Sequence, residues 1–335
     1  MDCRNLYNEI CSFENLYKAF RKAAKGKFSR QDVQKFLFNY EKELLQLKHE
    51  LEYFEYNPHP LKKFIIQDPK TRTIHASDFR DRVVHHALVN ILQLISEPMF
   101  IYDSFANQIG KGTHKALKRF DKFKRKVSNN GAIIRDARYS NQVSGYVLKA
   151  DIKHYFQTVD HEVLLNILSR KIKDENVIRL VKKILDNHVN KEKGKGMPLG
   201  NLTSQFFANV YLNELDQFVK HTVKAKYYIR YVDDFVLLDS SKQVLEEQMK
   251  QIDSFLQDKL KLELHPDKSG IFPIYHGTSF LGFRIFYYHK LLKKSNIKHF
   301  GRRLETLKQS VNSGTIDKEN FEKSVNGWMA YAEWG

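Results

Sequence analysis

The feature that most constrains this chain is a pair of acids inside an apolar run. Residues 227–232 and 235–239 are rich in aromatic, β-branched and aliphatic side chains, and Asp233 and Asp234 lie between them. This pattern predicts two strands joined as a β-hairpin with both carboxylates at its tip. Because acids beside a buried sheet are costly without a partner, the hairpin predicts a bound metal ion.

A third acid is expected to join this pair. Residues 146–152 predict a strand that carries Asp151. The helical patterns that follow cover residues 160–172, 177–189 and 203–219. After the hairpin, apolar spacing over residues 245–256 predicts another helix, and residues 262–264 predict a strand. The order β, α, β, β, α, β is the split βαβ arrangement, in which Asp151 and the hairpin tip can be neighbours on adjacent strands.

Three clustered carboxylates predict a divalent metal site. They repel one another and raise one another's pKa unless a cation lies among them. Mg²⁺, with Mn²⁺ as an alternative, accepts oxygen ligands and keeps positions open for substrate phosphates. Two such ions would activate a 3′-hydroxyl and stabilise a pyrophosphate leaving group in an in-line displacement. Taken alone, the hairpin could also be an ordinary surface Asp-Asp turn.

The composition predicts a polyanionic partner. The 335 residues include 56 Lys and Arg against 39 Asp and Glu, a net charge of +17, which favours nucleic acid. Eight of the sixteen residues from Lys111 to Lys126 are Lys or Arg, and Asp121 is the only acid there. Leu117, Phe120 and Phe123 give this stretch an apolar side, so we expect a basic helix that packs by one edge and contacts phosphate by the other. A merely solvated face is the alternative.

Other classes of protein are disfavoured. Cys3 and Cys11 are the only cysteines and have no His at matching spacing, so we expect reduced thiols rather than a disulfide framework or a zinc site. No apolar run approaches the ~18 residues of a spanning helix, and no signal peptide is visible. These observations predict a cytoplasmic protein without a membrane role.

Five ordered motifs resemble the palm motifs of reverse transcriptases. They are Lys-Ala-Asp-Ile-Lys-His-Tyr-Phe at 149–156, residues 200–205, Arg-Tyr-Val-Asp-Asp-Phe at 230–235, Leu-His-Pro-Asp-Lys at 264–268 and Phe-Leu-Gly-Phe at 280–283. The resemblance implies an α+β right-hand polymerase with fingers, a split βαβ (ferredoxin-like) palm and a short helical thumb. It also implies an RNA-directed DNA polymerase, a nucleotidyltransferase that binds template RNA, the RNA–DNA hybrid and dNTPs.

The resemblance implies a role for each matching residue. Asp151, Asp233 and Asp234 would be catalytic and hold the metals, with the backbone carbonyl of Ile152 assisting. The residues implied to bind the incoming dNTP are Lys70, Arg72, Phe156, Leu199, Gly200, Gln205 and Lys268. The residues implied to contact primer or template are Tyr231, Phe280, Leu281, Gly282, Lys293, Lys294 and Arg302.

Three of these roles have a physical basis. A rigid ring at Phe156, under the sugar, can exclude a 2′-hydroxyl by bulk, and an ordinary core aromatic is the alternative. Arg72, with Lys70, can hold a triphosphate through a planar guanidinium, and a solvated basic turn is the alternative. Lys268 lies where polymerases place a general acid for pyrophosphate.

The expected domains follow from these motifs. They are an N-terminal helical segment at 1–56, fingers at 57–144, a palm at 145–285 with a helical fingers insertion near 173–197, and a thumb at 286–335. The thumb stretch is basic, and Trp328, Tyr331 and Trp334 lie three apart near its end, which predicts core or docking positions.

The segment Leu199-Gly200-Asn201-Leu202-Thr203-Ser204-Gln205 resembles that of diversity-generating retroelements. Retrons, group II introns and most retroviral-type enzymes instead have Gln-Gly and then Ser-Pro here. The resemblance implies copying of a template-repeat RNA with errors at adenines, mutagenic retrohoming into a variable gene, and a small ring-forming basic helical accessory protein. The alternatives are a related stand-alone reverse transcriptase of antiphage defence, which copies a noncoding RNA, and a catalytically inactive RNA-binding palm protein. A group II intron maturase is disfavoured because the chain ends soon after the thumb.

Overall fold

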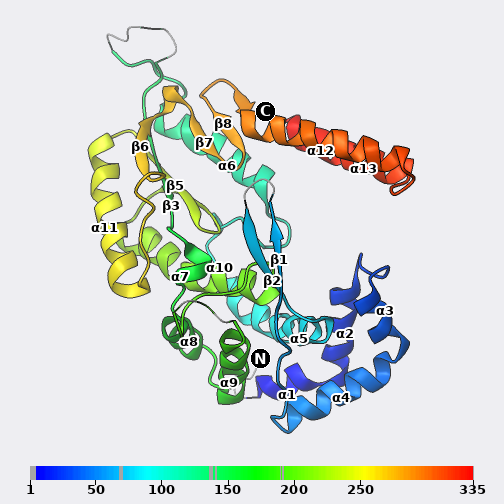
Figure 1. The fold of residues 1–335 in the computed structure, drawn as a ribbon. Helices are drawn as coiled ribbons and strands as arrows, with labels where there is room; N and C mark the ends of the chain where they lie inside the picture. The colour runs from blue at the N-terminus through cyan, green and yellow to red at the C-terminus, as the bar shows by residue number, and fades with distance from the viewer. Residues whose placement is uncertain are drawn as a thin grey trace.

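The N-terminal part of the chain is helical in this computed structural model, which describes residues 5–67, 71–135, 139, 142–188, 190 and 192–334. Four short helices lie at one end of the molecule (Figure 1). They are α1 (Leu6–Cys11), α2 (Phe13–Ala24), α3 (Gln31–Phe38) and α4 (Tyr40–Glu52). The helices α1, α2 and α3 contact α5 (Phe79–Ser96), which is followed by the short turn η1 (Glu97–Met99). Helices therefore occupy most of the stretch 5–56 that was predicted to be helical, and the last of them ends at Glu52.

A projecting hairpin separates these helices from α5. Strands β1 (Lys62–Ile66) and β2 (Arg72–Ala76) pair antiparallel, with Ile66 opposite Arg72. The side chain of Asp78 caps the first turn of α5 by accepting a hydrogen bond from the Arg80 N–H. Because β1 is exposed along its whole length, this hairpin has a free surface on which a ligand can lie.

The centre of the molecule is a four-stranded antiparallel sheet in the order β4-β5-β3-β6. Its strands are β3 (Tyr146–Asp151), β4 (Tyr227–Tyr231), β5 (Asp234–Asp239) and β6 (Gly270–Pro273). The predicted hairpin and the predicted strand before Asp151 are both present, and they are direct neighbours.

One predicted strand is wrong. Residues 262–264 form no strand, and only an isolated bridge joins Leu264 to Ile152. The chain turns at 265–269, where the His265 N–H donates to the Asp151 carbonyl at 2.7 Å, and it enters the sheet later, as β6. The split βαβ order is kept, but its last strand is displaced by several residues because this turn intervenes.

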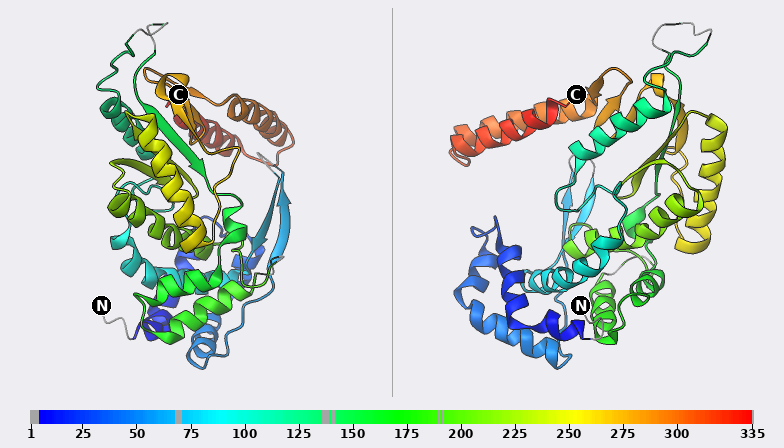
Figure 2. Two further views of the ribbon diagram at one scale, coloured as in Figure 1. Left: turned by 90° about the vertical axis from the view of Figure 1, so that its left-hand side faces the viewer. Right: turned by 180° about the vertical axis from the view of Figure 1, so that it is seen from behind.

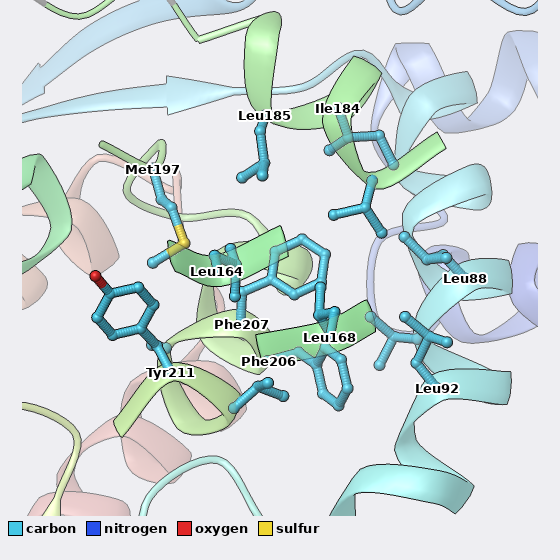
Figure 3. Packing of buried hydrophobic residues seen from close by; sticks show 14 of the residues in the cluster. Leu88, Leu92, Leu164, Leu168, Ile184, Leu185, Met197, Phe206, Phe207 and Tyr211 are labelled. Carbon is cyan, nitrogen blue, oxygen red and sulfur yellow. The ribbon is translucent and has the colours of Figure 1, made fainter. Parts of the chain in front are cut away.

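Helices cover one face of the sheet and fill the space towards the N-terminal helices. They are α7 (Tyr155–Thr158), α8 (His161–Ser169), α9 (Glu175–Asp186), α10 (Leu202–Gln217), the π-helical turn η2 (Phe218–Thr222) and α11 (Lys242–Leu260). Leucines, isoleucines and aromatic rings from α5, α8, α9 and α10 meet in one packed cluster (Figure 3). The helix predicted at 177–189 is α9, which begins and ends earlier.

The other face of the sheet packs on α6 (Thr113–Val127) and on a second small sheet. Val147, Ile229 and Val236 point to this face, whereas Leu148 and Phe235 point to the helices on the opposite face. Both faces are therefore covered, which explains why the strands are continuous apolar runs rather than alternating ones.

The C-terminal part consists of that small sheet and a two-helix arm. Its elements are η3 (Ile274–His276), β7 (Thr278–Phe280), β8 (Phe283–Ile285), β9 (Lys290–Leu292), α12 (Lys294–Asn312) and α13 (Lys318–Ala332). The arm extends away from the sheet (Figures 1 and 2). Trp328 stacks on Phe300 with ring centroids 3.8 Å apart, and Trp334 stacks on His114 at 4.4 Å. These contacts confirm packing positions for both tryptophans.

The residue ranges expected for the four domains agree with this order of elements, but the boundaries themselves stay a prediction. Residues 290–292 are a strand, so the helical pattern of the thumb begins at Lys294. Within the described ranges, no helix is both long and apolar enough to cross a membrane.

Candidate active site

The three acids meet at one edge of the central sheet. Asp151 ends β3 and is the register partner of Asp234, which begins β5. Val232 has a left-handed φ of 56°, so the turn between β4 and β5 is tight and Asp233 lies at its tip. The carbonyl of Asp233 accepts a hydrogen bond from the Ile152 N–H at 3.2 Å. This backbone contact holds the hairpin tip against the end of β3.

Burial and mutual repulsion raise the pKa values of two of the three acids. Burial raises the pKa of Asp234 to about 7, and the charges of Asp151 and Asp233 add to that rise while Lys149 opposes it. Burial also raises the pKa of Asp233, with a further contribution from Asp151. Such shifts are expected where carboxylates are gathered without enough positive charge to balance them.

Two lysines partly neutralise the acids. The Nζ of Lys268 lies 3.1 Å from Oδ1 of Asp151, and the Nζ of Lys149 lies 3.7 Å from Oδ1 of Asp234. The second distance is too long for a hydrogen bond, and Oδ1 of Asp234 is a buried oxygen without a hydrogen-bond partner in the described part of the chain.

The donor set fits a hard divalent cation, because an unpartnered buried carboxylate oxygen beside two further carboxylates can become a metal ligand. As the side chains are placed, no group of three His, Cys, Asp or Glu residues within the described ranges could hold a metal ion. Asp151 is instead turned towards Lys268. Metal ligation by Asp151, Asp233, Asp234 and the Ile152 carbonyl stays a prediction.

The β1–β2 hairpin reaches this site from the fingers side. Its backbone joins the segment before α10, since the His75 N–H donates to the Leu199 carbonyl at 3.3 Å. Arg72, at the start of β2, is exposed, and its charge slightly offsets the rise that burial causes in the pKa of Asp233. Lys70 lies outside the described residues. The structure thus brings Arg72 near Asp233 and joins Leu199 to the same hairpin from a separate segment.

Gly200 allows this close approach. It has a left-handed φ of 103°, and a Cβ there would lie 3.0 Å from Cγ2 of Ile74 on the hairpin. Beyond this contact, a cavity of about 460 Å³ opens between the hairpin, α5 and the start of α10, and Gln205 lines it. Gly200 and Gln205 are therefore both at the wall of an accessible space.

Phe156 is half-buried on α7, directly after the strand that carries Asp151. Its ring contacts Tyr155 edge-on with centroids 5.4 Å apart. Tyr155 is fully buried and donates a hydrogen bond to the Ala208 carbonyl at 2.9 Å. Phe156 thus has a rigid support and an exposed part, as expected for a ring that contacts a ligand.

The residues predicted to contact primer or template differ in exposure. Phe280 is fully buried and packs on Phe120, so its side chain as placed has no free surface for a primer. Leu281 and Gly282 form a half-buried turn with left-handed φ angles of 48° and 88°. The Gly282 carbonyl accepts a hydrogen bond from the Lys293 N–H at 3.0 Å, which ties this turn to the start of the thumb.

The remaining predicted contacts are Tyr231 at the end of β4 and two residues of α12. Tyr231 is half-buried, and its hydroxyl lies 3.4 Å from Oγ1 of Thr113. Lys294 and Arg302 are exposed on α12. All three residues keep surface that a nucleic acid could reach.

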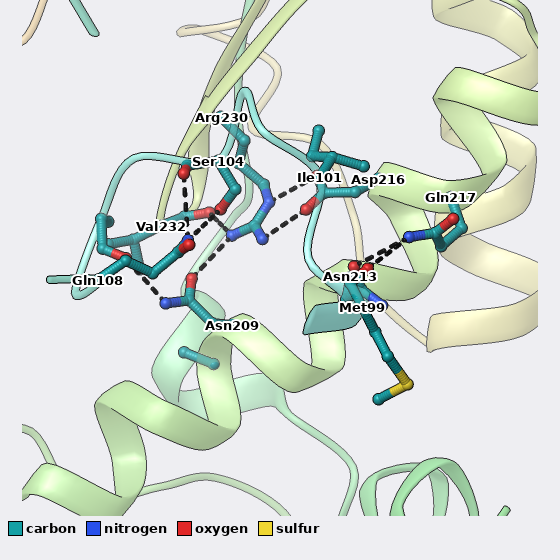
Figure 4. Close-up of polar contacts among 12 residues, drawn as sticks. Met99, Ile101, Ser104, Gln108, Asn209, Asn213, Asp216, Gln217, Arg230 and Val232 are labelled. Carbon is teal, nitrogen blue, oxygen red and sulfur yellow. Dashed lines mark hydrogen bonds and ion pairs between the residues drawn. The ribbon is translucent and has the colours of Figure 1, made fainter. Parts of the chain in front are cut away.

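A buried polar network supports the hairpin from behind, and the sequence analysis missed it. Figure 4 shows Arg230 of β4 between Asp216, Asn209 and the Val232 carbonyl. Its Nε and Nη2 donate to the two carboxylate oxygens of Asp216 at 2.7 and 2.6 Å, and its Nη1 donates to Val232 at 3.1 Å. An arginine inside an apolar strand was the available signal, because a buried guanidinium requires a buried acid.

This network has a clear electrostatic origin. Arg230 and Asp216 are both 0% exposed. Burial alone would lower the pKa of Arg230, but the carboxylate of Asp216 more than offsets it and holds that pKa above its ordinary value. The guanidinium therefore stays charged and holds the carbonyl of the left-handed residue next to Asp233.

A split βαβ sheet with three acids at one edge, a hairpin above it and a helical arm beyond it has the architecture of a right-hand nucleic-acid polymerase. Residues 62–285 match the family described as reverse transcriptase (RNA-dependent DNA polymerase). The chain belongs to this family and is by class an RNA-directed DNA polymerase.

Two known proteins are similar to the chain over about three quarters of its length. The chain is similar to the protein YkfC of Escherichia coli (strain K12), with 26% identity over 292 residues that cover 75% of this chain and 72% of YkfC. It is also similar to the group II intron-encoded protein LtrA of Lactococcus lactis subsp. cremoris, with 25% identity over 327 residues covering 76% of this chain. The matched region spans about half, 51%, of LtrA.

The fold also resembles solved structures. A structure of apo telomerase from Candida Tropicalis superposes with a TM-score of 0.53 at 13% identity, covering 73% of this chain and 58% of that one. This likeness shows the right-hand fold and nothing further.

Proposed function

We propose that this chain copies an RNA template into cDNA, using divalent metal held at the Asp151, Asp233 and Asp234 edge. The observation that carries the proposal is the register pairing of Asp151 with Asp234, next to the hairpin tip at Asp233. Mg²⁺, with Mn²⁺ as an alternative, would supply activation of the primer 3′-hydroxyl and charge neutralisation at the leaving pyrophosphate.

The residues around the acids have separate tasks in this proposal. Arg72 binds the triphosphate from the fingers side, and Lys268 leaves its ion pair with Asp151 to bind or protonate the departing phosphates. The half-buried ring of Phe156 lies under the sugar and rejects a 2′-hydroxyl. Arg230 keeps the hairpin tip in position through the Val232 carbonyl.

We further propose that the chain serves a diversity-generating retroelement, copying a template-repeat RNA with errors opposite adenine. The support is Leu199, whose aliphatic side chain is half-buried beside the cavity wall at Gly200. An aliphatic residue there offers no hydrogen bond to the incoming nucleotide, so the geometry of the base pair is checked less strictly. The accessory ring protein belongs to this proposal and has no separate support among the described contacts.

One experiment tests both levels. The purified chain is incubated with RNA from its own locus, a primer, Mg²⁺ and dNTPs, and the cDNA is sequenced. We expect cDNA from the wild-type chain and none above background from Asp233→Ala, with Asp258→Ala at an exposed position of α11 as the matched control. Synthesis by Asp233→Ala at the wild-type rate would refute the assignment of the metal site.

The sequenced products separate the finer proposal from the defence alternative. Errors concentrated at template adenines support the retroelement role, and Leu199→Gln should then change their frequency by several-fold. An error spectrum without adenine bias would refute that role while leaving cDNA synthesis intact. A spectrum that is biased to adenine but unchanged in Leu199→Gln would refute the part assigned to Leu199.

A further inference from the structure

The outer face of α6 carries cations that have no acidic partner among the described residues. Five basic residues of this helix are exposed: Lys115, Lys118, Lys122, Arg125 and Lys126. They follow one another at helical spacing, so they form a stripe along one side of the helix, about 16 Å long at 1.5 Å per residue. Within the described part of the chain, none of the five has a carboxylate partner. We call this set the α6 stripe.

The cations on the inner side of the same helix have acidic partners. Arg119 forms a two-pronged contact with Asp103, with distances of 2.6 and 3.0 Å. Lys124 is buried, pairs with Asp121 at 2.8 Å and donates to the Phe286 carbonyl at 2.7 Å. Asp121, the only acid of α6, is further engaged by Lys290 at 2.6 Å. The fold thus neutralises the cations that face it, whereas the α6 stripe has no carboxylate partner in the part of the chain that the structure describes.

This arrangement is unfavourable for the isolated protein. Lys118 and Lys122, and Lys122 and Lys126, are like charges four residues apart on a helix, and each such pair is destabilising by about 0.2–0.5 kcal/mol. The helix dipole favours cations in the last turn, which accounts for Arg125 and Lys126, but it disfavours Lys115 in the first turn. A bound polyanion removes both penalties.

The stripe is rigid and lies outside the catalytic edge. α6 is anchored by Phe120 and Phe123 on the sheet face opposite α10 and α11. Seen from behind, it crosses the molecule from the base of the thumb towards β6 (Figure 2, right). Its first turns touch the thumb, since Trp334 stacks on His114 and the Nζ of Lys118 lies 5.0 Å from the Trp334 ring centroid.

The chemistry of the face indicates which polyanion binds. No large apolar side chain of α6 is among the exposed ones of the described chain, whereas protein interfaces and membrane-binding helices need apolar anchors. A row of one cation per helical turn on a rigid helix suits contacts to phosphates, which give affinity without base sequence.

We propose that the α6 stripe binds the phosphate backbone of base-paired RNA outside the polymerase site. The surface is continuous with the thumb, so it holds a folded part of the same RNA whose single-stranded part is being copied. This inference rests on the proposed function only in that the chain copies RNA.

The test compares two probes on the full chain. The short probe is a primer–template hybrid of about 10 base pairs, and the long probe is the same hybrid with its template RNA continued into a hairpin of about 20 base pairs. The variant is Lys115→Gln/Lys122→Gln/Lys126→Gln, which spares Lys118 and its contact with Trp334. The control, Lys242→Gln/Lys250→Gln/Lys259→Gln on α11, removes the same charge from exposed positions.

We expect the wild-type chain and the control to bind the long probe about tenfold more tightly than the short one. The α6 variant should lose most of that gain, and its dependence of log affinity on log salt should be shallower by about 2 to 3. Primer extension on the short probe should stay unchanged, and the melting temperature should not fall, because the substitutions remove repulsion between like charges on α6.

Three results would overturn the inference. The first is equal binding of the long probe by the wild type and the α6 variant, as expected if an acidic protein occupies the stripe. The second is an equal loss of affinity for the long probe in the α11 control. The third is an equal loss of affinity for the short probe in the α6 variant. A wild-type chain that binds neither probe would refute the proposed function as well.

Discussion

Replacing Arg230 by Met should separate the stability of the palm from the position of the catalytic turn. The guanidinium makes four hydrogen bonds, two to Asp216, one to Asn209 and one to the Val232 carbonyl. Both members of the ion pair are fully buried, so Arg230→Met leaves an uncompensated buried anion. Breaking a buried pair in this way costs about 3–5 kcal/mol, which for a chain of 335 residues corresponds to a fall in melting temperature of about 4–7 °C.

A second substitution should recover much of this loss. Adding Asp216→Asn removes the buried charge and keeps an acceptor for the Tyr228 hydroxyl, which lies 2.8 Å from Asp216. The neutral pair then has no charge to desolvate. We expect the double variant to regain at least about half of the lost stability in thermal and urea unfolding.

Activity should not recover with stability. The bond from Arg230 to Val232 is a hydrogen bond from a charged donor, worth about 1.5–3 kcal/mol, and neither the introduced thioether side chain nor the introduced amide replaces it. If this bond positions the Asp233 carboxylate for the chemical step, its loss lowers kcat by about 10- to 100-fold, with little change in KM for dNTP. The assay is steady-state primer extension below the unfolding temperature of each variant.

Asp258→Asn, at an exposed position of α11, serves as the matched control and should have the stability and activity of the wild type. A double variant that regains both stability and kcat would show that the network only stabilises the fold. A single variant that unfolds normally and extends primers normally would refute the reasoning altogether.

Three further results are expected. Phe156→Ala should lower the preference for dNTP over rNTP in kcat/KM by at least about tenfold because the bulk under the sugar is lost, and an unchanged ratio would contradict that role. Burial lowers the pKa of His85 to about 3, so only the unfolded chain gains a proton between about pH 6.5 and 3; stability is lost as pH falls through that window. At pH 5 the free energy of unfolding is lowered by about 2 kcal/mol through this residue. Urea unfolding of His85→Gln should therefore show a pH-dependent loss that is smaller by about 2 kcal/mol than in the wild type. The same pH dependence in both proteins would exclude His85 as its source. Gly282→Ala places a Cβ against the Tyr331 hydroxyl at a left-handed φ, so we expect a cost in stability of about 1–3 kcal/mol and shorter cDNA products when rebinding of the enzyme is prevented by a trap. Gly301→Ala, with open space around it, should give cDNA of wild-type length. Products of equal length from both variants would contradict this role of the 281–282 turn.

The elements that local pattern defines were predictable. The run on either side of Asp233 and Asp234 encodes a hairpin because strand propensity and a tight turn are properties of a few consecutive residues. The helix at 111–126 was predictable for the same reason, since its apolar residues recur at helical spacing. The strand predicted at 262–264 failed because pairing partners, not propensity, decide where a short strand forms.

The candidate site was predictable only in part. The acids are identified by their motifs, but their electrostatics depend on neighbours from distant segments. Lys268 reaches Asp151 across 117 positions of sequence, and the hairpin at His75 meets Leu199 from a different part of the fold. No pattern within a window of the sequence contains such pairs.

The sequence by itself determined the chemistry that this chain can perform, because the acids and the residues around them are set by local order and spacing. Tertiary structure alone decided how that chemistry is held. It placed Asp216 of α10 behind Arg230, buried Phe280 away from solvent, and neutralised the inner cations of α6 while leaving its outer face charged. Burial and long-range pairing arise only when separate segments pack together, which is why the support of the turn and the free stripe appear first in the fold.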